Sequence, residues 1–145
     1  MGWLQSHVIK AILGFTNTEG GGVLLIGVSD DGKGNREFTG VNDGMLPSYA
    51  NLEAIQESID RYADGPLSYT LKPVSYDNEG TEQTYIAIWV NEFKSQPVLC
   101  SRDKCGVKAN GKEEFYLRNH DMYARSRKGR IGTIKATNLE LQEIL

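Results

Sequence analysis

Three consecutive glycines, Gly20 to Gly22, constrain the fold of this chain more than any other feature of its sequence. Apolar residues recur at helical spacing before them, from Leu4 to Phe15, which predicts a helix that ends near Asn17. An unbroken apolar run follows them, from Val23 to Val28, and predicts a short strand that is covered on both faces and central in a sheet. The glycines therefore form a turn from a helix into a strand.

This order of elements bears on the use of the glycines. A glycine loop that binds phosphate follows a strand and precedes a helix, because its N–H groups and the positive end of the helix then point at the anion. Here the order is reversed, and no Lys-Ser or Lys-Thr pair follows the glycines. We therefore interpret the stretch as a left-handed helix cap and a site of close backbone packing. Its structural residues are Asn17, Gly20, Gly21 and Gly27.

The remainder of the chain alternates between helical and strand patterns, which predicts an α+β fold with a mixed, mostly antiparallel sheet and packed helices. We expect residues 1–145 to form a single domain, as a fragment of a longer protein. Pro73 predicts that its strand lies at a sheet edge or carries a bulge. The ranges expected to be helical are 52–62 and 139–145, and those expected to be strands are 37–41, 69–76, 84–90, 98–101, 106–109 and 114–118.

The net charge of −3 conceals a strong division along the chain. Residues 1–92 hold five basic and thirteen acidic side chains, a net charge of −8, whereas residues 93–130 hold ten basic and four acidic ones, a net charge of +6. Screening at physiological salt acts over about 8 Å, so an acidic far side does not cancel a basic near side. The acidic composition therefore does not exclude a nucleic-acid partner.

Basic and aromatic residues alternate towards the end of the basic part of the chain. Guanidinium groups donate paired hydrogen bonds to phosphates and aromatic rings stack on bases, so this mixture suits nucleic acid. The alternative is a solvated loop, which is the usual structure of a run of charges. The residues predicted to bind nucleic acid are Lys112, Arg118, Tyr123, Arg125, Arg127, Lys128 and Arg130.

Two stretches of the sequence show a family pattern. "ILGFTNTEGGGVLLIGVSDDG" resembles the opening of the Schlafen-type, divergent Alba (AlbA_2) domain, in which a helix ending in Asn-Thr runs into paired glycines and an apolar strand. "NGKEEFYLR", residues 110–118, is similar to a later signature of that family, and the matching segments span residues 8–120. The resemblance implies sequence-tolerant binding of DNA or RNA by a module of a transcriptional regulator or a defence protein. It also implies a homodimer.

The same resemblance implies a catalytic alternative, a metal-dependent endonuclease. Schlafens with ribonuclease activity use three carboxylates, two from an acidic stretch before the first helix and one from the Asp-Asp after the first strand. Only Asp30 or Asp31 matches this set in the present sequence. One or two neighbouring carboxylates hold a divalent cation poorly, so a nuclease requires acidic residues from outside this chain.

The sequence also bears on metal binding, on cellular location and on a third possible function. Cys100 and Cys105 lack the second half of a zinc-ligand pattern, so we expect no metal site and no cofactor. No apolar run reaches the length of a membrane segment, and we expect a cytoplasmic protein. A protein-interaction or nucleotide-sensing module, with the basic run as a solvated loop, is the third alternative for the function.

Overall fold

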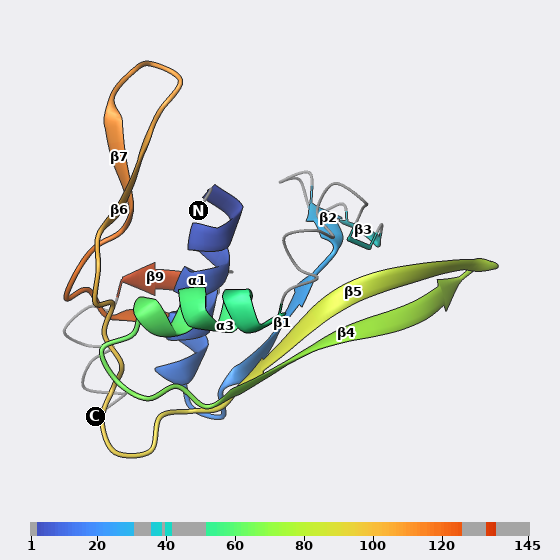
Figure 1. The fold of residues 1–145 in the computed structure, drawn as a ribbon, viewed down its shortest axis with the longest axis horizontal. Coiled ribbons are helices and arrows are strands. Elements are labelled where there is room, and N and C mark those ends of the chain that lie inside the picture. Colours follow the sequence, from blue (N-terminus) through green and yellow to red (C-terminus); the bar gives the residue numbers. More distant parts are fainter. Residues whose placement is uncertain (1–2, 31–35, 39, 42–51, 126–132, 136–145) are drawn as a thin grey trace.

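The computed structural model describes residues 3–30, 36–38, 40–41, 52–125 and 133–135 (Figure 1). Within these ranges helices and strands form an α+β arrangement in which every strand pair is antiparallel, which confirms the predicted fold class. The expected helix at 139–145 lies outside the described residues. The elements are α1 (Trp3–Thr16), β1 (Gly22–Ile26), β2 (Val28–Asp30), β3 (Arg36–Phe38), α3 (Leu52–Arg61), β4 (Tyr69–Asn78), β5 (Thr81–Val90), β6 (Lys104–Val107), β7 (Glu113–Leu117), β8 (Tyr123–Arg125) and β9 (Thr133–Lys135).

The largest sheet in the described part of the chain has the strand order β1-β5-β4. β5 is its central strand and pairs with β4 along its whole length. β4 lies at the edge of this sheet, as Pro73 predicts, because proline has no N–H to donate to a second neighbouring strand. The turn between the two strands places Glu79 and Gly80 at positive φ, which is the geometry of a tight hairpin turn.

The position of β1 differs from the sequence-based expectation. Among the described strands β1 pairs with β5 alone, so it lies at the edge of the β1-β5-β4 sheet, and the predicted central position is wrong. Val23 and Leu25 are 52% and 43% exposed, whereas Ile26 is buried. Successive side chains of a strand point to opposite faces, so an unbroken apolar run is compatible with one open face.

The hydrophobic core joins α1 to the inner face of this sheet and to later segments of the chain. The members of the core cluster in α1 recur at helical spacing, and those in β5, Ile86, Ile88 and Val90, alternate along the strand and so lie on one face. Burial of one such side chain stabilises the fold by about 1.5–3 kcal/mol. Fully or nearly fully buried members of the core are Ile9, Ile12, Leu13, Ile59, Ile86, Ile88, Val98 and Leu117.

Residues 98–101 do not form the predicted strand: they make one isolated antiparallel bridge, between Cys100 and Ala63, and side chains bind the N–H groups that precede it. The N–H of Val98 donates to the side-chain oxygen of Asn17 at 2.8 Å. The N–H of Leu99 donates to the Asp64 carboxylate at 2.7 Å. The segment is therefore held by one bridge and by side chains, and not by a continuous ladder of strand hydrogen bonds.

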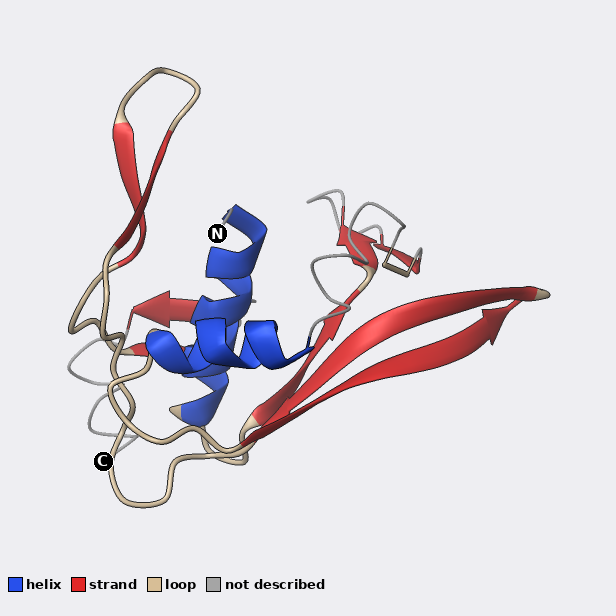
Figure 2. Ribbon diagram, viewed as in Figure 1, coloured by secondary structure: helices blue, strands red, loops and turns tan. Residues whose placement is uncertain are grey.

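Two hairpins, β4–β5 and β6–β7, project from the body in different directions (Figures 1 and 2). The β6–β7 hairpin forms from the predicted strands at 106–109 and 114–118, each beginning and ending slightly earlier in the chain. Its register shifts between Lys104 and Cys105, which bends the ribbon near its base. Leu117 at the end of β7 is fully buried, so the hairpin is anchored in the core.

Candidate nucleic-acid interface

Asn17, at the turn after α1, connects three segments of the chain. Its side chain is 1% exposed. Its amide nitrogen donates to the carbonyl oxygens of Val98 at 2.8 Å and Tyr123 at 3.0 Å, and its amide oxygen accepts from the N–H of Val98. A buried polar group left without a partner costs about 1–3 kcal/mol, so these bonds fix both segments. Asn17 thus ties the end of α1 to the chain before and after the β6–β7 hairpin.

The glycines that follow Asn17 serve a tight turn and a close backbone approach. Gly20 and Gly21 have φ values of +80° and +67°, a region that favours glycine. A Cβ at Gly21 would overlap the carbonyl oxygen of Val90 in β5. The N–H of Gly20 donates to a carboxylate oxygen of Glu92 at 2.9 Å. A carboxylate of the chain itself therefore takes a donor that an open phosphate loop would present to its anion.

Gly27 separates β1 from β2 where the chain passes close to two other segments. Its φ is +123°. A Cβ here would lie 2.7 Å from the ring of Tyr85 and 3.0 Å from the backbone of Gly40. The N–H of Gly40 also donates to the Gly27 carbonyl oxygen at 2.8 Å. The space at this position thus accepts glycine and no larger residue.

Arg125 lies in β8, against the last turn of α1. Its N–H donates to the hydroxyl of Thr18 at 3.1 Å, and its guanidinium carbon lies 4.7 Å from the centre of the Phe15 ring. The side chain is half-buried, and this burial lowers the pKa of the guanidinium from its ordinary value. The helix that ends in the glycine turn therefore also positions one of the predicted binding residues.

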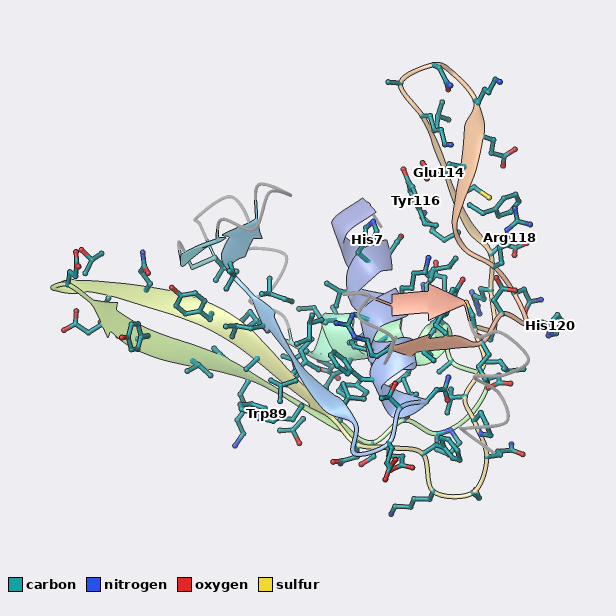
Figure 3. All side chains as sticks on the ribbon, turned by 180° about the vertical axis from the view of Figure 1, so that it is seen from behind. His7, Trp89, Glu114, Tyr116, Arg118 and His120 are labelled. Carbon is teal, nitrogen blue, oxygen red and sulfur yellow. The ribbon has the colours of Figure 1, made fainter. Side chains whose placement is uncertain are left out.

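Arg118 lies at the end of the β6–β7 hairpin, near its base (Figure 3). Its side chain is exposed, and its guanidinium carbon lies 4.2 Å from the centre of the Phe115 ring. Its backbone N–H donates to the Tyr123 hydroxyl at 3.1 Å. A guanidinium that lies flat on a ring keeps its N–H edges available for other acceptors, so the side chain is oriented and still able to bind.

Tyr123 does not present its ring at the surface. The residue is 3% exposed, the ammonium of Lys10 lies 5.0 Å from the ring centre, and burial raises the pKa of its hydroxyl to about 12. A ring in this position packs the interior between α1 and β8 and cannot stack on a base. We therefore leave Tyr123 out of the proposed interface.

Lys112 lies at the tip of the β6–β7 hairpin, and the structure places Lys108 beside it. The carbonyl oxygen of Lys112 accepts from the N–H of Lys108 at 2.8 Å. The N–H of Lys112 donates to the side-chain oxygen of Asn110 at 3.0 Å. Gly111 completes the turn at a φ of +82°. Both lysine side chains are exposed. The sequence-based set omitted Lys108, although the four-residue spacing of Lys104, Lys108 and Lys112 was visible in the sequence.

The model of one protein family, Schlafen, AlbA_2, matches residues 2–125 of the chain. The chain belongs to the Schlafen, AlbA_2 family. The match includes the glycine turn, both hairpins and β8, so it covers the described candidate residues of this Schlafen AlbA_2 chain. No curated protein and no solved structure gave a significant match.

The remaining candidate residues of this Schlafen AlbA_2 chain are only partly placed. Arg127, Lys128, Arg130 and Asp31 lie outside the described residues. Asp30 is the last residue of β2 and pairs with Arg36 of β3 in the register. Within the described ranges, no three or more His, Cys, Asp or Glu residues are grouped to hold a metal ion, and neither helix is long and apolar enough to span a membrane.

Proposed function

We propose that this Schlafen AlbA_2 chain binds DNA or RNA through its basic segment, mainly by contacts to the phosphate backbone that tolerate many sequences. Membership of the family supports nucleic-acid interaction. The observation that carries the proposal is the exposed Arg118, whose described side-chain contact is with the Phe115 ring and not with a carboxylate. This guanidinium retains its capacity for a phosphate.

The surroundings of Arg118 support the same function. Lys108 and Lys112 are exposed at the tip of the hairpin whose base holds Arg118. Arg125 is fixed on Phe15 and Thr18 in the following strand pair. Cations held by rings and by backbone bonds lose less conformational freedom on binding than cations on a loop, so each phosphate contact is less costly to form.

The division of charge along the chain also favours a polyanionic partner for this segment. The β6–β7 and β4–β5 hairpins are separate projections (Figure 1), and the exposed acidic side chains Asp77, Glu79 and Glu82 belong to β4–β5 or its turn. Attraction between exposed charges is screened within about 8 Å at physiological salt. The carboxylates of β4–β5 therefore repel a nucleic-acid strand at the β6–β7 hairpin only weakly.

Fluorescence anisotropy with labelled DNA and RNA oligonucleotides tests the proposal. We expect the double variant Lys112→Gln with Arg118→Gln to weaken binding by about tenfold or more, because two phosphate contacts are lost. The matched control is Lys72→Gln with Arg61→Gln, which removes the same charge from exposed sites elsewhere. Equal affinities for both double variants would contradict an interface at the basic segment.

The same oligonucleotides separate binding from cleavage. Incubated with the protein and Mn²⁺, the labelled strands should stay at full length on a denaturing gel. Strand cleavage that disappears in Asp31→Asn would instead favour the endonuclease alternative. From the family resemblance we further propose that the binding domain acts as a homodimer within a transcriptional regulator or a defence protein. The cytoplasm is its proposed location, as the sequence led us to expect.

A further inference from the structure

The β6–β7 hairpin stands clear of the body, and its outer half contacts little else. Val107 is 71% exposed, and the side chains from Lys108 to Glu113 are all exposed. At the other end Leu117 is completely buried, and a Cβ at Gly106 would overlap the hydroxyl of Tyr116. The Tyr116 ring thus lies across the opposite strand. The hairpin is an anchored, stiffened ribbon with a free tip.

The dimensions of this ribbon match one feature of nucleic acids. Two paired strands lie about 4.8 Å apart, and at about 3.3 Å per residue the strands and turn extend roughly 15 Å from the base. The major groove of B-form DNA is about 12 Å wide and about 8.5 Å deep and admits a two-stranded ribbon. The major groove of an A-form RNA duplex is deep and too narrow for side chains to read.

The side chains of the ribbon suit a groove better than a single strand. Proteins bind single strands by stacking bases on exposed aromatic rings. Phe115 is 39% exposed but has Arg118 over its ring, and the Tyr116 ring lies against Gly106, so neither ring is fully open for stacking. The tip instead carries lysines, which donate to the O6 and N7 atoms of guanine in the major groove. Arg118, at the base, is placed for the phosphates that flank the groove.

We propose, on the basis of the proposed function, that the β6–β7 hairpin enters the major groove of a B-form DNA duplex as a two-stranded ribbon. Lys108 contacts the edges of the bases, and Lys112 and Arg118 contact backbone phosphates. The substrate class is therefore double-stranded DNA, in preference to duplex RNA or a single strand.

Val107 gives this ribbon a specific contact within the groove. In the register it lies opposite Glu113 and on the same face as Phe115, so one face of the hairpin is partly apolar. Thymine displays its C5-methyl group in the major groove. The exposed Val107 side chain can make an apolar contact with this methyl group. Burial of one methyl group corresponds to about a fourfold change in affinity.

Anisotropy titrations of one sequence in three forms test the groove assignment: duplex DNA, duplex RNA and single-stranded DNA at the same salt concentration. We expect duplex DNA to bind about tenfold or more tightly than either other form. The variant Lys108→Ala with Lys112→Ala should remove most of this preference. Its matched control, Lys72→Ala with Lys94→Ala, takes the same charge from exposed sites off the hairpin and should keep the preference.

Two chemical probes locate the groove. Methyl green, which occupies the major groove, should compete with the protein, and netropsin, which occupies the minor groove, should not. Replacement of thymine by deoxyuridine should weaken binding by about fourfold at most for each contacted methyl group, and Val107→Ser should abolish this difference.

The outcomes separate this inference from the proposed function. Salt-sensitive binding that is equal for all three forms, and that is weakened by Lys112→Gln with Arg118→Gln, overturns the groove assignment and leaves the proposed function standing. Displacement by netropsin alone also overturns the groove assignment. Failure to bind any of the three forms overturns both.

Discussion

The β4–β5 and β6–β7 hairpins have the same architecture and opposite charge. Each is an antiparallel pair that ends in a turn with a glycine at positive φ. Residues 69–90 hold one basic and three acidic side chains, a net charge of −2, whereas residues 104–117 hold three lysines against Glu113 and Glu114, a net charge of +1. Backbone geometry is therefore shared between the two projections, and the partner that each can accept is set by side-chain charge.

The two hairpins also differ in how they expose apolar side chains. Among the described residues, every large hydrophobic side chain that is exposed lies on the β1-β5-β4 sheet or on β6–β7. On the sheet they share one outer face, because Val23 lies opposite Trp89 and the others follow at alternate positions (Figure 3). On β6–β7, Val107 and Phe115 sit on a ribbon next to lysines. The outer face of the sheet carries a single lysine, Lys72, whereas the β6–β7 ribbon carries three, so the second arrangement attracts a polyanion more strongly.

Replacement of Asn17 should have the largest effect, because it should loosen the segments that flank β6–β7 and leave β4–β5 intact. Asn17→Ala removes the partners of Val98 and Tyr123, so the free energy of unfolding should fall by about 3 kcal/mol. Hydrogen exchange should show lost protection around β8, while the β4–β5 amides stay protected. The control Asn91→Ala removes one exposed bond, to the Ser68 hydroxyl, and should cost about 1 kcal/mol or less. A uniform loss of protection over both regions would contradict selective anchoring.

Reversal of charge on each hairpin tests whether their roles differ. Lys108→Glu with Lys112→Glu should weaken duplex DNA binding by about 100-fold at moderate salt, because two contacts are replaced by repulsion. Glu79→Lys with Glu82→Lys should change the affinity by about threefold at most, since screening isolates that tip. Electrophoretic mobility shift measures both. Comparable effects of the two reversals would show that net charge, and not the location of the cations, governs binding.

The two turns should respond equally to one backbone change. Gly80 and Gly111 have φ values of +85° and +82°, and a Cβ at either would meet nothing within 4 Å. Gly80→Ala and Gly111→Ala should therefore each lower the free energy of unfolding by about 1 kcal/mol, the cost of a left-handed residue. Denaturant titration gives both values. A much larger loss at one turn would mean that the hairpins are not built alike.

The smallest effect concerns alkaline pH near the basic hairpin. Burial raises the pKa of Tyr123 to about 12, above its ordinary value of 10.0, so the folded state retains this proton longer than the unfolded state. The stabilisation is complete below pH 10.0 and is lost as the pH rises towards about 12. Tyr123→Phe should flatten the fall in melting temperature over this window, whereas Tyr76→Phe, at an exposed site of the acidic hairpin, should keep it. An unchanged slope in Tyr123→Phe would contradict the burial argument.

The sequence predicted the parts of the fold that depend on local pattern. The helix before Asn17 and the strands expected at 69–76 and 84–90 each appear, because each follows from the pattern of neighbouring residues. The edge position of β1 was not predictable, since apolar residues alone do not show which face finds a neighbour. The course of residues 98–101 was missed for a related reason, because it depends on Asn17, 81 residues away from Val98.

The candidate site was predictable by residue type and not by exposure. Lys112 and Arg118 lie at the surface, where their charge places them in most proteins. Tyr123 is buried, because β8 packs against α1, and this contact arises only after the chain has folded. Aromatic residues serve equally well for stacking and for packing, so the sequence alone did not separate these roles.

The dependence of binding on salt tests the central claim most directly. With about four phosphate contacts, the logarithm of the association constant for duplex DNA should fall against the logarithm of salt concentration with a slope of about −3 to −4. In the Lys112→Gln with Arg118→Gln variant the slope should become shallower by about two. A slope near zero in the unaltered protein would contradict binding through the basic segment.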